Sequence, residues 1–347
     1  MKSFVLVLMT LTCLISGAAA DDSVPWKNKQ ITMIIGFAAG GGTDAAGRLI
    51  ARFLGKYLAE QPTFVVRNQP GADGLTALNY MIQQTKPDGL YVAMGSSSQV
   101  DPVNYRTARA SYDPSNFAFI GGMGRGRSVV LIWAGSVERL YDKSAPPVMM
   151  GSVGVPRSTM QVAAWGIEYL GWTAKWVLGY RGTNDLILAL RRGEIDMTSA
   201  DLPTAIDMVE SGNFKVVTQA GSQDVGRSRV PPEIEQAAVF KDLMKGKISD
   251  PVARQAFDFW LGLNSVDKWL ALMPGTQPAI VEVYRDAFAK ASVDSEFMEF
   301  GKNLTSDFSP VGYKAVEAIV LTLAATPPEA IGHASSLLRK QGIDIAN

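Results

Sequence analysis

The stretch of sequence that decides the fold covers residues 31–48 and reads ITMIIGFAAGGGTDAAGR. An apolar run typical of a buried strand stops at three consecutive glycines, and a Thr-Asp pair then precedes an alanine-rich segment. Glycine in a regular element costs about 0.5–1 kcal/mol relative to alanine, so three in a row indicate an unusual backbone path or a closely approaching ligand. An ordinary tight turn between a strand and a helix is the alternative interpretation.

The segment after the glycines predicts a helix over residues 44–59, because Ala46, Ile50, Leu54 and Leu58 recur four residues apart. Apolar runs and helical patterns then alternate along most of the chain, and the last eighty residues are mostly helical. The predicted strands are 31–37, 64–67, 91–95, 129–133, 148–151, 175–180, 195–198, 216–219 and 269–273. This alternation predicts an α/β protein with parallel sheets covered by helices.

The first twenty residues, MKSFVLVLMTLTCLISGAAA, have the pattern of a secretory signal peptide. The only cysteine, Cys13, lies inside it, so we expect no disulfide in a mature protein that starts near Asp21. The 33 basic and 33 acidic residues leave no positive excess for binding nucleic acid. We therefore expect a soluble protein exported to the periplasm, long enough for two domains.

Sequence motifs for catalysis are missing. His333 is the only histidine, and its place in a predicted C-terminal helix indicates a surface position. Paired-histidine metal centres and Ser-His-Asp triads need histidines in a cleft. The chain also contains no G-x-S-x-G motif, and STMQ at Ser158 lacks the lysine of an S-x-x-K motif. The glycine run has neither the G-x-G-x-x-G spacing nor the G-K-[ST] ending of nucleotide-binding loops. The sequence favours a binding protein over an enzyme, with no metal and no cofactor.

The glycine run predicts an anion site. We expect the helix to begin near Thr43 or Asp44, since both residue types cap helices well. The amides of Gly40, Gly41, Gly42 and Thr43 would then point out of the helix N-terminus, where the helix dipole favours a carboxylate. The carboxyl ends of parallel strands are also where open α/β sheets bind ligands. Asp44 is expected to cap the helix.

A second turn of this kind lies in VMMGSVGVPRSTM, residues 148–160. A strand ends at Gly151 and Ser152, the chain passes Gly154, and a helix follows near Ser158. Two such turns would suit a ligand with a carboxylate at each end. Arg157 and Arg181 lie in or near turns of this kind and could add charge-assisted hydrogen bonds; a solvated surface role is the alternative for each.

Four segments resemble, in the same order, those of the tripartite tricarboxylate transporter substrate-binding proteins, the Bug or TctC family. They are ITMIIGFAAGGGTDAAGRLIARFL, VVRNQPGADGLTALNYMIQQTKPDGLYVAMGSSS, GYRGTNDLILALRRGEIDMTSADLPTAIDMVESGNFKVVTQ and LALMPGTQPAIVEVYRDAFAKA. The resemblance implies a two-domain periplasmic binding protein of type II that closes like a flytrap. Each domain would have a central, mostly parallel sheet flanked by helices. Domain 1 would contain residues 21–124 plus 267–347 and domain 2 residues 125–266, after a signal peptide at 1–20, with the chain crossing twice at the hinge.

The resemblance also implies a function. The protein would capture a small organic carboxylate between its domains and deliver it to a membrane transporter; presentation to a membrane sensor kinase is the alternative, and a periplasmic enzyme is less favoured. We expect a monomer that binds no nucleic acid. The predicted ligand-binding residues are Phe37, Ala39, Gly40, Gly41, Gly42, Thr43, Asp44, Ser96, Ser97, Gly151, Ser152, Gly154, Arg157, Ser158, Arg181 and Asp201.

The chain departs from the family pattern in three places, one of them the Pro-Gly loop, where Asp73 stands in place of the usual glycine. In the second loop, Pro156 and Arg157 stand where the family often has glycine and serine. Residues 231–268 are longer than the corresponding family segment and show little similarity to it. We therefore predict an altered far end of the pocket, lined by aromatic rings that favour a longer or aromatic carboxylate; the alternative is that these rings belong to the core. The rings in question are Phe257, Phe259, Trp260 and Trp269.

Overall fold

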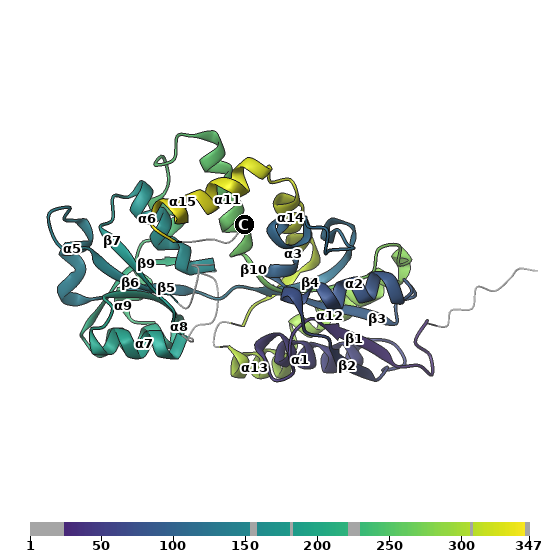
Figure 1. Cartoon of the computed structure of the whole chain (residues 1–347). Coiled ribbons are helices and arrows are strands. Elements are labelled where there is room, and N and C mark those ends of the chain that lie inside the picture. Colours follow the sequence, from purple (N-terminus) through teal and green to yellow (C-terminus); the bar gives the residue numbers. More distant parts are fainter. Residues whose placement is uncertain (1–23, 153–157, 181–182, 221–229, 306–307, 344–347) are drawn as a thin grey trace, which may run out of the picture.

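Two separate β-sheets organise the chain (Figure 1). The structure is a computed structural model, and it describes residues 24–152, 158–180, 183–220, 230–305 and 308–343. The first sheet has six strands in the order β11-β4-β10-β3-β1-β2, and the second has five in the order β7-β6-β8-β5-β9. We call the elements packed on the first sheet the first lobe and those packed on the second sheet the second lobe.

Both sheets are mixed, with two parallel pairs of strands in each, and the edge strand β11 of the first sheet is antiparallel to β4. In the first, β1 runs parallel to β2 and β3, while β10 is antiparallel to β3 and to β4. In the second, β6 is parallel to β7 and β8, while β5 is antiparallel to β8 and β9. The strands of the first sheet are β1 (Ile31–Ile35), β2 (Phe64–Asn68), β3 (Tyr91–Ser96), β4 (Ala118–Gly124), β10 (Val266–Leu272) and β11 (Pro310–Gly312). Those of the second are β5 (Ser128–Trp133), β6 (Val148–Ser152), β7 (Ala174–Leu178), β8 (Met197–Asp201) and β9 (Phe214–Ala220).

Helices cover both faces of each sheet, which confirms the predicted α/β class. The first lobe contains α1 (Gly42–Tyr57), α12 (Pro278–Ser292) and α13 (Ser295–Leu304) on one face, and α2 (Leu75–Gln84), α3 (Ser97–Val100), α4 (Pro102–Tyr105) and α14 (Tyr313–Ala324) on the other. The second lobe contains α6 (Val162–Tyr169), α10 (Phe240–Leu243), α11 (Pro251–Leu263) and α15 (Pro328–Lys340) on one face, and α7 (Thr183–Arg192), α8 (Leu202–Glu210) and α9 (Pro232–Glu235) on the other. Short elements complete the chain: α5 (Val137–Tyr141) and the 3-10 turns η1 (Ala72–Gly74), η2 (Pro114–Asn116), η3 (Ala134–Ser136) and η4 (Ser158–Gln161).

All nine predicted strands are present, and the sequence analysis missed β4 and β11. Strand β4 reads AFIGGMG, and glycine disfavours a strand because it has no side chain to pack. Contacts with other parts of the fold explain why glycine occurs in this strand. A Cβ at Gly121 would lie 2.2 Å from the ring of Phe288, and one at Gly122 would lie 2.5 Å from the backbone oxygen of Lys268. The close approach of α12 and β10 therefore requires them.

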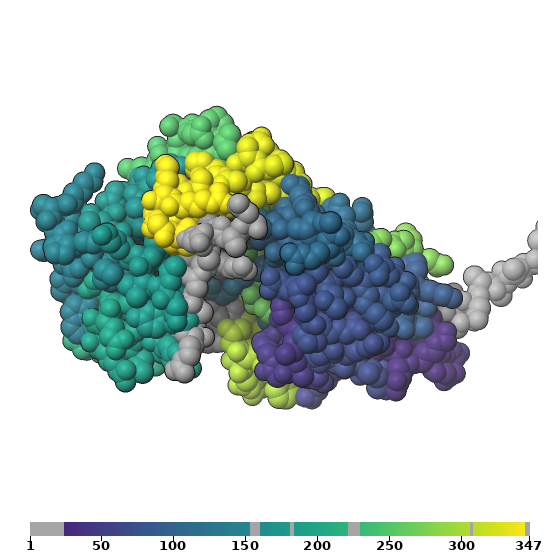
Figure 2. Space-filling model, viewed as in Figure 1, coloured from purple at the N-terminus to yellow at the C-terminus, as the bar shows by residue number. Residues whose placement is uncertain are grey.

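The connection between β4 and β5 brings one edge of each sheet close to the other. Residues 125–127 alone connect β4 to β5, so the Cα atoms of Gly124 and Ser128 can be at most about 14 Å apart. The strand directions place the ends of β1, β3 and β4 and the start of β10 at this edge of the first sheet. The ends of β6, β8 and β9 and the start of β5 lie at the facing edge of the second. Figure 2 shows the surface notched between the lobes.

Helix α15 makes a further connection between the lobes (Figure 1). Helix α14 packs on the first sheet, and Arg106 of the first lobe donates from Nη1 to the oxygen of Thr326 at 2.9 Å. After a bend of 83° at the α14–α15 junction, α15 packs on α6 and α11, where Leu337 is buried. Within the described part of the chain, no helix on its own has the length and hydropathy to cross a membrane; only the bent α14–α15 pair meets that test.

The predicted domain limits stay a prediction. The limit at 124/125 falls at the end of β4, whereas the limit at 266/267 falls inside β10, and α15 was not expected beside the second lobe.

The expected surface position of His333 is wrong. This residue is half-buried on α15, with Nε2 at 3.1 Å from the hydroxyl of Tyr169 and its ring stacked at 6.4 Å on Trp165.

Candidate ligand-binding site

The glycine loop connects β1 to α1, and its geometry differs from expectation at the start of the helix. Helix α1 begins at Gly42 with Gly41 as the N-cap residue, so the expected start near Thr43 or Asp44 is wrong by one or two residues. The carboxylate of Asp44 does not cap the helix. It turns back and accepts a hydrogen bond from the amide of Gly40 at 2.8 Å.

Asp44 holds the loop in place. Its side chain is only 4% exposed and also accepts hydrogen bonds from Arg48 Nε at 3.0 Å and from Asn68 Nδ2 at 2.9 Å. Asn68 Nδ2 also donates to the backbone oxygen of Phe37 at 2.9 Å, which ties the end of β2 to the start of the loop. These donors, the Arg48 guanidinium first, lower the pKa of Asp44 to about 2. Asp44 is therefore ionised at neutral pH, with both oxygens engaged inside the protein.

Three backbone amides at the start of α1 have no acceptor within the helix. The first intrahelical bond runs from the Ala45 amide to the Gly41 oxygen at 2.9 Å, so the amides of Gly42, Thr43 and Asp44 precede the helical ladder. The Gly40 amide, predicted to be available, is taken by Asp44. The backbone amides that could bind a ligand are therefore those of the first residues of α1, whereas the sequence predicted amides from Gly40 onward.

The glycines of the loop are explained by different features of the structure. Gly40 adopts a left-handed backbone with φ of +82°, which favours glycine. Gly42 has no such backbone, and a Cβ built there would meet nothing within 4 Å. Residues 38–42, which include Ala39 and Gly41, are exposed, and Phe37 is half-buried. The described part of the chain therefore does not itself require glycine at position 42, since no described atom lies close to where its side chain would be.

The predicted serines lie at the same edge of the first sheet. Ser96 ends β3 and caps α3; its amide donates to Gln99 Oε1 at 3.0 Å. The hydroxyl of Ser97 accepts a hydrogen bond from Nη2 of Arg125 at 3.0 Å. Arg125 was not among the predicted residues. The sequence feature that points to Arg125 is its position directly after β4. That feature can be used only when β4 has been recognised as a strand.

The second loop follows β6. A Cβ at Gly151 would lie 2.4 Å from Cδ1 of Ile195, so packing accounts for this glycine, and its role in binding stays a prediction. Ser152 is buried, with its hydroxyl 3.3 Å from the sulfur of Met160. Ser158 begins η4, as a helix start was expected there. Three further predicted residues lie outside the described residues, namely Gly154, Arg157 and Arg181.

Asp201 lies at the facing edge of the second sheet, opposite Ser128 at the start of β5. Its carboxylate caps α8 and accepts a hydrogen bond from the amide of Thr204 at 3.0 Å. This capping accounts for an aspartate at position 201 without a ligand.

The four aromatic residues proposed for the far end of the pocket are core residues, which is the alternative that the sequence left open. Phe257, Phe259, Trp260 and Trp269 are each at most 5% exposed. The indole of Trp269 also donates to the oxygen of Ser96 at 2.8 Å, which fixes β10 against β3. Trp260 in addition borders a cavity of about 380 Å³ between the end of β9 and the end of α11.

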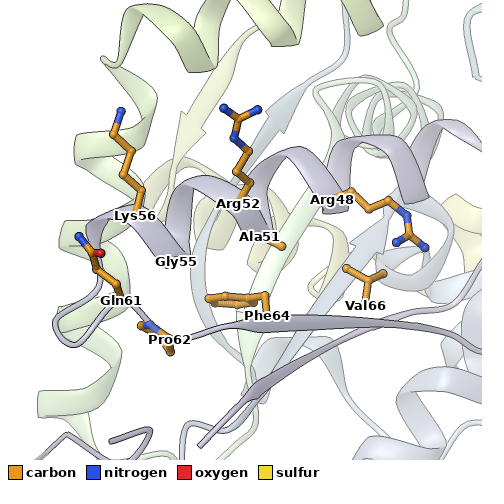
Figure 3. A pocket seen from close by; sticks show the side chains of 9 residues that line it. All are labelled: Arg48, Ala51, Arg52, Gly55, Lys56, Gln61, Pro62, Phe64 and Val66. Atoms are coloured by element: carbon orange, nitrogen blue, oxygen red, sulfur yellow. The ribbon is translucent and has the colours of Figure 1, made fainter. Parts of the chain in front are cut away.

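A groove of about 580 Å³ runs along α1 and β2 (Figure 3). Three cations, Arg48, Arg52 and Lys56, line it at successive turns of the helix. Each is paired with an acid: Arg48 with Asp44 at 3.0 Å, Arg52 with Glu296 at 2.6 Å and Lys56 with Asp294 at 2.6 Å. Because these charges are compensated and the groove follows the length of α1, it is a weaker anion site than the N-terminus of the helix.

Comparison with known proteins identifies the family. The family model of the tripartite tricarboxylate transporter family receptor, TctC, matches residues 47–244. A Cupriavidus necator protein described as the UPF0065 protein in gbd 5'region is 26% identical over 290 residues, covering 79% of this chain and 77% of its own length. A TctC solute-binding protein from Polaromonas superposes with a TM-score of 0.66 at 20% identity, covering 90% of this chain and 98% of its own. R. palustris Rpa4515, solved with adipate, superposes with a TM-score of 0.55 at 20% identity, covering 92% and 99%.

The structural similarities show that the two-lobed fold is that of solute-binding proteins, as the sequence predicted. The family model covers more than half of the chain, from within α1 to the end of α10. Its members are receptors and not enzymes, in agreement with the missing catalytic motifs. The chain belongs to the tripartite tricarboxylate transporter family receptor (TctC) family.

Proposed function

We propose that this protein captures a small organic carboxylate in the periplasm, between its two lobes, and delivers it to a tripartite tricarboxylate-type membrane transporter. The observation that carries the proposal is the open space at Gly42. There the amides of Gly42, Thr43 and Asp44 have no acceptor among the described residues. Gly42 is exposed with no Cβ in the way, whereas the side chains of Thr43 and Asp44 are buried. Amides at the positive end of a helix dipole bind a carboxylate oxygen well.

Two further findings support this ligand class. The chain belongs to a family of tricarboxylate transporter receptors, and a protein of the same fold was solved with adipate, a dicarboxylate. Asp44, the nearest acid, does not oppose an anion strongly, because Arg48 neutralises its charge at 3.0 Å. The loop thus offers backbone donors next to a balanced ion pair.

The same arrangement gives a mechanism for closure. The first lobe would hold the carboxylate at α1, and residues on the facing edge of the second lobe would complete the site. A ligand can shift the protein toward a closed form only by binding that form more tightly than the open one. Residues 125–127, residues 264–265 between α11 and β10, and the bend between α14 and α15 are the connections that such a hinge motion would use. We propose that the closed monomer is the form that engages the transporter.

Thermal unfolding in the presence of carboxylates tests the proposal. The panel contains C4–C8 dicarboxylates, citrate, acidic amino acids and aromatic acids. A micromolar ligand present at millimolar concentration should add about 4 kcal/mol to the free energy of unfolding. Small-angle scattering should then show a smaller radius of gyration with that ligand. No stabilisation by any carboxylate would refute the proposed ligand class, and an unchanged radius at saturation would refute the closure.

A further inference from the structure

A cluster of charged side chains surrounds the point where the chain passes from the first lobe to the second. It contains Arg125, directly after β4, and Asp267 and Lys268 at the start of β10, next to Ser97. Nη2 of Arg125 lies 3.0 Å from the Ser97 hydroxyl and 3.3 Å from Asp267 Oδ1. Nζ of Lys268 lies 2.7 Å from the other oxygen of the same carboxylate. Two cations therefore share one internal anion.

A β-bulge builds this cluster. Val266 pairs with Gly124 and Lys268 pairs with Met123, so Asp267 is an extra residue on β10. Neighbouring residues of a regular strand point to opposite faces, and a bulge changes that direction locally. It allows Asp267 to reach both Lys268 and Arg125. Bulges of this kind are common beside binding sites because they redirect a side chain.

The guanidinium of Arg125 has unused capacity. It carries five N–H donors in a planar fork that suits a carboxylate, and both of its acceptors contact the same nitrogen, Nη2. Its Nε is buried and has no hydrogen-bond partner among the described residues. The side chains of Arg125 and Asp267 are 25% and 33% exposed, so the group is open to solvent and can exchange partners.

The cluster lies within reach of the glycine loop. Strands β1 and β10 are separated only by β3 in the sheet, and Lys268 lies directly opposite Ser96 at the end of β3. Two strand spacings amount to about 10 Å. This spacing between the strands is of the same order as the length of a short aliphatic diacid.

We propose that Arg125 and Lys268 bind a second anionic group of the ligand, so that the protein selects dicarboxylates over monocarboxylates of the same length. This inference rests on the proposed function, because it assumes that the first carboxylate binds at the start of α1. Asp267 occupies the cations in the open protein, and the incoming carboxylate replaces it as the partner of Arg125. Asp267 therefore lowers the affinity for the ligand and prevents uncompensated positive charge when the site is empty.

Calorimetric titration of the mature protein with matched pairs of acids tests the proposal. Each pair has the same number of carbons, from succinate with butyrate to suberate with octanoate, and includes adipate with hexanoate. In the wild type, the best diacid should bind at least tenfold more tightly than its matched monoacid. Arg125→Gln should weaken that diacid 10- to 100-fold and the monoacid less than threefold. Lys268→Gln should act in the same direction, and Asp267→Asn should tighten the diacid.

The control is Arg109→Gln, the same substitution at an exposed position of the first lobe, which should leave both affinities unchanged. A wild type that binds mono- and diacids equally, or a folded Arg125→Gln variant with an unchanged ratio, would overturn this inference and leave the proposed function intact. Should Arg125→Gln fail to fold, Asp267→Asn decides, because unchanged or weaker diacid binding would overturn the inference. A wild type that binds none of these acids but binds another carboxylate of the thermal-unfolding panel would overturn this inference alone, and a wild type that binds no carboxylate would refute the proposed function itself.

Discussion

Replacement of Gly42 by alanine separates stability from ligand binding. The new Cβ meets nothing within 4 Å, and the backbone of Gly42 lies outside the left-handed region, so the folded protein accommodates it without strain. Glycine to alanine at a compatible site stabilises by about 0.4–1 kcal/mol, because the unfolded chain loses conformational freedom. For a protein of this size the unfolding temperature should rise by about 1–3 °C.

The same methyl group would stand in front of the amides of Gly42 and Thr43, where we place the ligand carboxylate. Loss of one hydrogen bond to a charged group costs about 1.5–3 kcal/mol. The dissociation constant measured by calorimetry should therefore increase by about tenfold to 150-fold. The expected variant is thus more stable than the wild type and binds its ligand less tightly.

Gly332→Ala is the matched control. Gly332 is exposed on α15, and a Cβ there also meets nothing within 4 Å. The substitution should raise the unfolding temperature by a similar amount and leave the dissociation constant unchanged. If Gly42→Ala bound the ligand as tightly as the wild type, the assignment of the carboxylate to this helix start would be refuted.

Three further predictions concern the glycine loop and the cores of the two lobes. Asp44→Asn should lower the free energy of unfolding at pH 7 by about 1–2 kcal/mol, because charge-assisted hydrogen bonds from Arg48 and the loop are lost. The pKa of Asp44 is lowered from 3.8 to about 2, so its contribution is complete above pH 4 and disappears as the pH falls through 2. Urea unfolding of both proteins from pH 7 to pH 2 should show the two stabilities converging; a constant difference would contradict the reasoning. Gly95→Ala should cost about 1–3 kcal/mol in urea unfolding, since a Cβ would lie 2.2 Å from the buried ring of Trp269, and a neutral effect would show that β10 can shift. Phe257→Ala should cost about 3–5 kcal/mol without changing the ligand preference of the folded protein, and a selective loss of aromatic acids would return this ring to the binding site.

Much of the fold could be predicted because local pattern and tertiary packing agree. Strand β1 and helix α1 show the apolar periodicity that their burial requires, and their connection was placed within two residues. Strand β4 could not be found, because its glycines serve contacts with Phe288 and with the backbone of β10, which come from distant parts of the chain. The local propensity of a segment to form a strand does not reveal contacts with distant parts of the chain.

In the candidate site, too, some features could be predicted from the sequence and others could not. The glycine loop and its exposed helix start were recognisable from the sequence, since glycine and helix-start residues act locally. The role of Asp44 was not recognisable from the sequence. Its carboxylate accepts a hydrogen bond from Asn68, which lies 24 residues away, and does not cap the helix. The packing reason for Gly151 was hidden for a related reason, because Ile195 becomes its neighbour only in the folded sheet. Arg125 required the register of β4 and β10 before its place in the site could be seen.

The path of α15 has a practical consequence for following this protein optically. Trp26, near the first described residue, is buried in the core of the first lobe, whereas Lys340 at the end of α15 pairs with Glu168 of the second lobe at 2.7 Å. Fluorophores attached near these two ends would therefore sit on opposite lobes, and energy transfer between them would report lobe movement directly. The only cysteine of the chain, Cys13, lies in the predicted signal peptide, so cysteines introduced at Lys27 and Arg339 could be labelled without a competing thiol. The folding of the chain thus makes its two ends natural attachment points for a carboxylate sensor.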